Sequence, residues 1–269
     1  MNRIDLAGLD MAALYALARD PASPRPRREA ARDALRGIRA DTLSRARAAL
    51  EPQPEPEAPQ PATASRAPAV SRATRLEEIG AEYEAMFDAA EPLAERAHEI
   101  AAFRARLRRG ADAYRAAEAE TGVPWIFTGL THGLEAGFDF SRHLHNGDPL
   151  TARTVRVPAG RPAAGQPPFS WEASAADALR GHGLHRIRDW TLARLLFELE
   201  RYNGFGYRRR AAPTPYLWSF SNQYRAGKYV KDGVYDPEAV SRQAGAATVL
   251  KAMIRAGEIV APPRAFRSA

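Results

Sequence analysis

The sequence predicts a mainly α-helical protein with one long irregular loop, preceded by a helical N-terminal extension and a proline-rich linker. Three observations support this fold class. Apolar residues recur at three- and four-residue steps along most of the chain, which is the period of an amphipathic helix. Repeated prolines interrupt this pattern once, between residues 51 and 72. Alternation typical of strands is scarce, and the best short candidate is 154–157.

The composition of the 269 residues excludes several classes of protein. The chain has no cysteine, so it can form neither a disulfide framework nor a thiolate zinc site, and it cannot use a cysteine nucleophile. No run of 18 apolar residues is present, so we expect no membrane-spanning helix. Asp5 and Asp10 interrupt the apolar N-terminal stretch, so we expect synthesis in the cytoplasm without a signal peptide.

The formal net charge of +7 favours polyanionic partners such as nucleic acid, anionic lipid or an acidic cell-wall polymer. Arginine supplies all but three of the 39 cations. No nucleic-acid-binding motif is present, so we expect no specific nucleic-acid partner.

The spacing of prolines and apolar residues predicts four segments. Residues 1–50 form a basic helical extension, and residues 51–72 form a linker because repeated prolines favour an extended chain. Residues 73–257 form the main helical domain, and residues 258–269 form a C-terminal tail. We expect the arginine-rich extension to attach the protein to an anionic wall or membrane surface.

Within the main domain, the first predicted helix begins near Thr74, and a second, long helix runs from Leu93 through Tyr114 until Gly122 and Pro124 stop it. A short buried helix follows over 125–135. Helix caps then predict three further helices: from Ser170 to Leu179, from Asp189 to Asn203, and from Asp236-Pro237 to Gly257.

Glu135 is the strongest candidate for a chemical role. It ends the apolar segment that begins at Trp125, and Phe138 and Phe140 follow it. Removing a carboxyl group from water disfavours its charged form and raises its pKa, which suits a general acid. The alternative is that Glu135 faces solvent at the end of a helix.

The loop 143–162 is the second candidate feature, because long loops without regular structure are often binding loops. It contains His145, Asn146 and Asp148 between turn glycines. A zinc site made by His132, Glu135 and the histidines of this loop is an alternative. We expect instead no metal and a hydrogen-bonding role for His145.

Aromatic and amide side chains gather in the third feature, residues 200–229. Aromatic faces can stack on the apolar side of a sugar ring while amides bind its hydroxyls. Rings with this spacing can equally belong to a core. The candidates are Tyr202, Asn203, Tyr216, Trp218, Asn222 and Tyr224.

Residues from about Thr121 to Leu250 resemble the lysozyme-family proteins of bacteriophages and prophages, within the lysozyme-like, lytic-transglycosylase-like superfamily. The stretches that carry the resemblance include TGVPWIFTGLTHGLEAGFDF, SRHLHNGDPL, VPAGRP, ERYNGFGY and PYLWSFSNQYRAGKYVKDG. Glu135 matches the catalytic glutamate of the superfamily, and Tyr202-Asn203-Gly204 is similar to its Tyr-Asn-x-Gly motif. Ala136 departs from the serine usual in transglycosylases, and their Gly-Leu-Met-Gln motif is absent.

This resemblance implies a lysozyme-like domain that cleaves the bond between N-acetylmuramic acid and N-acetylglucosamine in peptidoglycan strands. Glu135 would be the acid, and no cofactor would be needed. The outcome, hydrolysis or formation of an anhydro-sugar, stays open, as does a part for Asp139 or Asp148. We expect a monomer that acts on the wall after release or delivery. The alternatives are a zinc-dependent wall peptidase and an inactive wall-binding or phage-structural protein.

Overall fold

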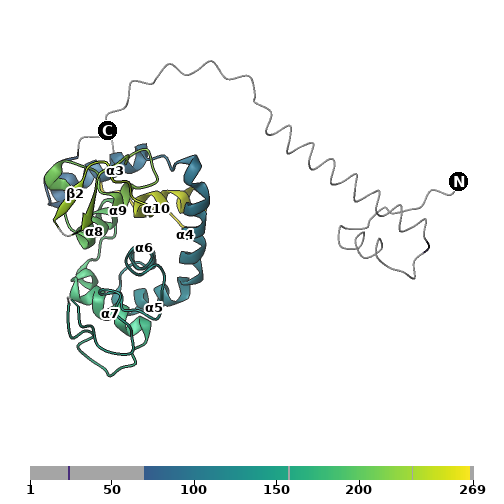
Figure 1. Cartoon of the computed structure of the whole chain (residues 1–269), viewed down its shortest axis with the longest axis vertical. Coiled ribbons are helices and arrows are strands. Elements are labelled where there is room, and N and C mark those ends of the chain that lie inside the picture. The colour runs from purple at the N-terminus through teal and green to yellow at the C-terminus, as the bar shows by residue number, and fades with distance from the viewer. Residues whose placement is uncertain (1–23, 25–69, 157, 232, 267–269) are drawn as a thin grey trace, which may run out of the picture. The chain divides into compact units, whose positions relative to one another are not determined.

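The computed structural model describes residues 24, 70–156, 158–231 and 233–266. The chain divides between Ala64 and Ser65, and nearly all described residues belong to the second unit. This unit is mainly helical, as predicted (Figure 1). The helical extension 1–50 and the linker 51–69 lie outside the described residues apart from Pro24. None of the described helices combines the length and apolar character needed to cross a membrane.

Helices occupy most of the described domain, with one short antiparallel hairpin. The α-helices are α3 (Leu76–Ala89), α4 (Ala97–Arg109), α5 (Ala111–Thr121), α6 (Trp125–Ala136), α7 (Trp171–Gly181), α8 (Leu192–Asn203), α9 (Pro215–Trp218) and α10 (Ala246–Arg255). The hairpin strands are β1 (Lys228–Lys231) and β2 (Val234–Asp236). Short 3-10 turns cover Ala94–Arg96, Leu184–Arg186 and Arg208–Arg210.

Helix α6 lies in the middle of the domain. Figure 1 shows it between α5 and α7 on one side and α8, α9 and α10 on the other. Every residue from Ile126 to Gly133 is buried. Two glycines on this helix let aromatic rings approach closely: a Cβ on Gly129 would lie 3.0 Å from the Tyr114 ring, and a Cβ on Gly133 would overlap Phe103. The sequence of α6 therefore suits a helix enclosed by its neighbours.

The predicted long helix is in fact two helices, and the break falls at Gly110. A Cβ at this position would lie 2.6 Å from the Phe140 ring and 2.8 Å from the Tyr114 ring, so the close packing requires a glycine. The predicted stop after α5 is confirmed, since Gly122 ends that helix with φ of 74°. The bend lets α4 and α5 contact different neighbours: α4 packs on α10, and α5 packs on α7.

One predicted N-terminal helix cap is confirmed, and another lies two residues further along the chain. The Ser170 hydroxyl accepts a hydrogen bond from the Ala173 N–H and opens α7, as expected. The cap of α8 is Thr191 rather than Asp189, because the Thr191 hydroxyl accepts from the Arg194 N–H. The end of α8 at Asn203-Gly204 agrees with the sequence.

The prediction of a helix from Asp236 to Gly257 is wrong in its first half, because α10 begins only at Ala246. The Asp236 carboxylate does accept from the N–H groups of Glu238 and Ala239, but it caps a turn and not a helix. The next stretch is held from outside, because the Ala239 carbonyl accepts from the Gly227 N–H at 2.9 Å and the Ser241 N–H donates to the Tyr224 hydroxyl at 3.2 Å. A tertiary contact therefore overrides the local cap signal.

The predicted strand at 154–157 is absent among the residues described there, and the observed hairpin was not predicted. In place of a strand, the Thr154 hydroxyl donates to the Pro158 carbonyl and closes a local turn. The hairpin joins Lys228–Lys231 to Val234–Asp236. Its signal was the Asp232-Gly233 pair, a frequent hairpin turn.

Both predicted borders of the main domain need extension. Val70 is buried in the core, and the Ser71 N–H donates to Glu82, so the end of the predicted linker packs on the domain. The predicted tail packs there as well. Glu258 forms an ion pair with Arg104 at 2.7 Å, and the Pro263 carbonyl accepts from the Leu192 N–H at 2.8 Å.

A buried ionic cluster joins α3 to α8. The Arg208 side chain is 1% exposed and lies 3.0 Å from the Glu200 carboxylate, which is 2% exposed. The Tyr83 hydroxyl donates to the same carboxylate at 2.5 Å, and Arg208 also donates to the Ser71 carbonyl. Burial raises the pKa of Glu200, and the charge of Arg208 opposes that rise. Each of these buried polar groups is therefore stabilised by its contacts with the others in the cluster.

We expect Arg208→Ala to reduce the free energy of unfolding by about 3–5 kcal/mol, because it leaves the buried Glu200 charge without its partner. Denaturant unfolding of a protein that begins at Ser65 would measure the change. Arg186→Ala is the control, since Arg186 is exposed and has no ion pair among the described residues. A loss for Arg208→Ala as small as that of the control would contradict this account of the cluster.

Candidate functional site

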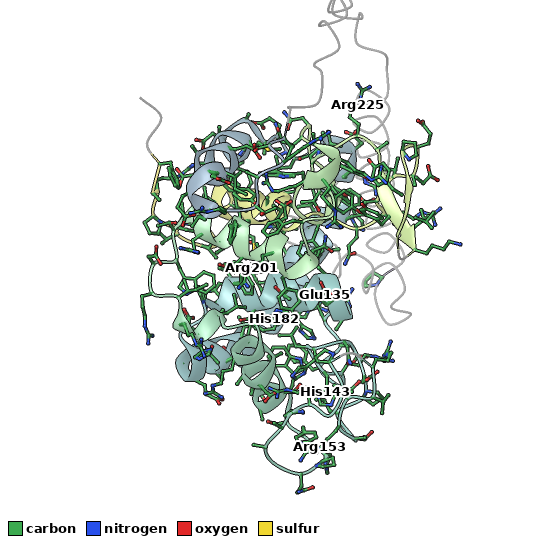
Figure 2. All side chains as sticks on the ribbon, turned by 90° about the vertical axis from the view of Figure 1, so that its left-hand side faces the viewer. Glu135, His143, Arg153, His182, Arg201 and Arg225 are labelled. Atoms are coloured by element: carbon green, nitrogen blue, oxygen red, sulfur yellow. The ribbon has the colours of Figure 1, made fainter. Side chains whose placement is uncertain are left out.

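Helix α6 places Glu135 in its last turn, where the buried helix reaches the surface. Gly137 ends the helix in the left-handed conformation, and its N–H donates to the His132 carbonyl. The Gln243 side chain donates to the carbonyls of Gly133 and Leu134, at 3.4 and 2.9 Å. These contacts fix the backbone that carries the Glu135 side chain, which Figure 2 shows near the middle of the domain.

The environment of Glu135 combines solvent contact with partial desolvation. The side chain stays exposed, while protein atoms crowd its carboxyl group, as expected on the wall of a cleft. This burial raises the pKa of Glu135, and the nearby Tyr216 hydroxyl opposes the rise. A carboxyl group with a raised pKa can keep its proton at a higher pH than an ordinary glutamate.

Two tyrosines from different elements lie near this carboxyl group. The Tyr216 hydroxyl is buried and has no partner within hydrogen-bonding distance among the described residues, so its contact with Glu135 is longer than a regular hydrogen bond. The Tyr202 hydroxyl donates to the Leu144 carbonyl at 3.1 Å. Burial raises the pKa of both phenols, and the charge of Glu135 adds to the effect. Both phenols are therefore neutral near pH 7.

A small hollow borders the end of α6, and a larger hollow adjoins it. The smaller has a volume of about 190 Å³, and its walls include Leu134, Asn203 and Tyr216. The larger has a volume of about 780 Å³ and lies between the end of α8 and the β-hairpin. Both hollows share Asn203 and Tyr207 as wall residues, so they adjoin one another. Together they form adjoining space that begins at Leu134 and Tyr216, the neighbours of Glu135.

The histidines of the loop 143–162 hold the loop against α7. The ring of His143 contacts the Ser174 hydroxyl at 2.7 Å through Nδ1 and the Ala152 carbonyl at 2.8 Å through Nε2. His145 Nε2 lies 2.8 Å from the Asp177 carboxylate. The loop in turn presents the Leu144 carbonyl to Tyr202. Both histidines therefore act on the site through the backbone between them.

These contacts do not favour the zinc alternative. Both ring nitrogens of His143 have protein partners, and His132 is likewise placed between the Tyr114 hydroxyl and the Asp139 carbonyl. Burial lowers the pKa of His132 to about 4. Within the described part of the chain, no three His, Asp or Glu side chains are arranged to hold a metal ion.

The side chains of the other two candidates in this loop, Asn146 and Asp148, form hydrogen bonds with the backbone of the loop itself. The Asn146 amide donates to the Arg156 carbonyl, and its oxygen accepts from the Asp148 N–H. Asp148 accepts from the N–H groups of Arg156 and Val155, which lowers its pKa to about 2. Asp139 is bound by Ser141 and Arg142. The structure thus engages both candidate second carboxylates in local contacts.

The aromatic and amide candidates divide into two groups. Tyr202, Asn203 and Tyr216 lie around Glu135, as described above. Trp218 is 2% exposed and belongs to the core. Asn222 bridges to α3 by donating to the Ala89 carbonyl, and Tyr224 borders a separate hollow of about 400 Å³. The structure does not bring these last three side chains to the acid.

Sequence reasoning missed four residues that shape the site. Gln243 braces α6, Tyr207 and Lys228 border the smaller hollow, and His182 stacks on Tyr202 with ring centroids 4.3 Å apart. The signal for Gln243 was hidden because its segment was assigned to a helix. His182 lies beyond the predicted helix end at Leu179, and nothing local indicated that it would stack on Tyr202.

No protein-family model, curated protein or solved structure matches this chain. A functional assignment therefore rests on the residues and geometry described above.

Proposed function

We propose that this protein is a peptidoglycan glycosidase in which Glu135 is the general acid. The observation that carries the proposal is the partly desolvated carboxyl group of Glu135, on a helix end braced by Gln243 and next to a hollow that Leu134 and Tyr216 line. The resemblance of residues 121–250 to phage lysozymes supports the same role. In the reaction, protonated Glu135 donates its proton to the glycosidic oxygen while the muramic acid ring gains oxocarbenium character.

A single carboxyl group restricts the second half of the reaction. Retention through a glycosyl-enzyme requires a second carboxylate about 5–5.5 Å away. Asp139 and Asp148 are bound to arginines instead, and among the described residues no carboxylate acts on the pKa of Glu135. The Glu135 carboxylate formed by proton donation would act as the base. It would take a proton from water, or from the 6-hydroxyl of the muramic acid to give a 1,6-anhydro ring.

The Tyr216 hydroxyl supports this change of role. It is buried and lies near both Glu135 and the Thr131 hydroxyl without a regular hydrogen bond among the described residues, and it favours the carboxylate form of Glu135. It would therefore stabilise the charge that appears after proton transfer. The neutral phenol of Tyr202 completes the wall on the other side, where the Leu144 carbonyl fixes its orientation.

We expect Glu135→Gln to lower the rate of wall lysis by at least about 100-fold, because the amide keeps the shape but has no proton to transfer. Turbidity loss of purified sacculi measures the rate, and circular dichroism checks folding. Asp139→Asn is the matched control, since that carboxylate contacts only Ser141 and Arg142. Retention of more than about a tenth of the wild-type rate by Glu135→Gln would exclude it as the acid.

The products should be muropeptides that end in muramic acid, and mass spectrometry of soluble fragments would identify them. Water as the nucleophile gives reducing ends, whereas attack by the 6-hydroxyl gives anhydro ends that are lighter by one water. Release of free peptides with intact glycan strands would instead identify a peptidase.

The pH dependence of lysis should report the environment of Glu135. The acid must be protonated, so the rate should fall as the pH rises through the raised pKa of Glu135. Tyr216→Phe removes a group that lowers this pKa, so the alkaline limb should move to higher pH. Tyr202→Phe is the control, because that hydroxyl donates to Leu144. A limb that stays in place, or moves to lower pH, in Tyr216→Phe would contradict the assignment.

We expect EDTA to leave lysis unchanged, because the ring nitrogens of His132 and His143 are engaged with protein groups. The assay is lysis of sacculi after extensive dialysis against the chelator. Loss of activity that zinc restores would favour the peptidase alternative.

A further inference from the structure

Many cations of the described domain have carboxylate partners, but those around the hollows beside Glu135 differ. Arg255 pairs with Glu91 at 2.6 Å, and Arg264 pairs with Asp88 at 2.5 Å. Arg209 and Lys231 border the larger hollow, and Lys228 borders the smaller one. Among the described residues, no carboxylate forms an ion pair with these three cations. The walls that the structure describes around the larger hollow contain no acidic side chain.

A rigid aromatic cluster builds the larger hollow. The Tyr207 hydroxyl accepts from the Tyr229 N–H at 3.1 Å, and the Tyr229 hydroxyl donates to the Gly206 carbonyl at 3.3 Å. The Arg210 guanidinium stacks over the Tyr235 ring at 4.3 Å from its centroid. These contacts fasten the β-hairpin to the turn after α8. The side chains of Arg209 and Lys231 are exposed, and both border this hollow, Arg209 from the 3-10 turn after α8 and Lys231 from β1.

We propose that this hollow binds the carboxylates of the peptide stem carried by muramic acid, with Arg209 and Lys231 as the binding residues. The inference rests on the proposed glycosidase function and adds a substrate requirement to it: the enzyme acts on peptide-bearing strands in preference to bare glycan. The binding residues lie away from the acid, so they affect affinity and not the chemical step.

The chemistry of the substrate fits this arrangement. The stem peptide is attached through the lactyl group at C3 of the muramic acid ring whose C1 bond is cleaved, so it leaves the glycan from the same sugar on which Glu135 acts. Its residues carry several free carboxylates on an extended backbone. The smaller hollow of about 190 Å³ is lined by Leu134 and Tyr216, the neighbours of the acid, and the larger hollow of about 780 Å³ adjoins it at Asn203 and Tyr207. A stem that leaves the ring at the acid therefore has the larger hollow as its adjoining space.

The test compares Arg209→Gln/Lys231→Gln with Arg186→Gln/Arg188→Gln, which removes the same charge from exposed residues that border none of the hollows described here. Three soluble substrates share one glycan chain length. The first carries native stems, and the second carries stems whose carboxylates are amidated with carbodiimide and ammonium chloride. The third has its stems removed by an amidase, which leaves only the lactyl carboxylate.

For the wild type, kcat/KM should fall roughly fivefold from native to amidated stems and by a similar factor on stripped strands, mainly through a higher KM. Arg209→Gln/Lys231→Gln should show that loss already on native stems and no further loss on amidated ones. The control double variant should behave as the wild type does.

Equal wild-type rates on all three substrates would overturn the stem-binding site, and so would an equal loss of kcat/KM in both double variants. Neither result would contradict the proposed cleavage of the glycan. A wild-type rate on stripped strands that matches native strands would overturn it too, because the lactyl carboxylate would then suffice. If none of the substrates yields muramic-acid-ended products, the glycosidase proposal itself fails.

Discussion

The burial of α6 among helices on several sides is the packing constraint on which the rest of the domain depends. A helix enclosed in this way must have apolar and small residues over most of its surface, and Gly129 and Gly133 let the Tyr114 and Phe103 rings approach the helix axis. Its last turn is the first part to reach solvent. Glu135 stands there, so its carboxyl group is crowded by protein and still accessible to a ligand.

The elements around α6 all act on the position or the protonation of the Glu135 carboxyl group. The loop 143–162 is attached to α7 by two histidines, and it orients Tyr202 through a backbone carbonyl. The segment before α10 supplies Gln243, which braces the end of α6. Helix α9 supplies Tyr216. These residues come from four separate parts of the chain, and each acts on the position or the protonation of one carboxyl group.

Electrostatics divides the domain into two kinds of charged region. In the interior, Arg208 and Glu200 neutralise each other and bind the domain border at Ser71 to α8. At the hollows beside Glu135, cations remain without described partners. Charges that satisfy one another stabilise the fold at fixed positions, whereas charges left open to solvent are available to an anionic ligand.

The sequence by itself determined the helical class, the helix ends at Ser170 and Asn203-Gly204, and the choice of Glu135 as the candidate acid. These features depend on the periodicity of apolar residues and on local hydrogen bonding. It also indicated Tyr202, Asn203 and Tyr216, which the structure gathers around the acid. Local signals could not separate these residues from Trp218, Asn222 and Tyr224, which have the same chemistry but contact the core, α3 and another hollow.

Tertiary contacts decided the rest. The Phe140 ring packs against Gly110, where the predicted long helix divides, and contacts with Gly227 and Tyr224 hold Ala239 and Ser241 in the stretch before α10. The Arg156 side chain donates to the Asp148 carboxylate, although the sequence left Asp148 open as a second carboxylate near the acid. Phe140 and Tyr224 are distant partners, whereas Arg156 lies in the same loop as Asp148; in each case the folded chain supplies a contact that the local pattern did not indicate. Helical period and caps are properties of neighbouring residues, whereas the surroundings of a side chain depend on which distant segments pack against it.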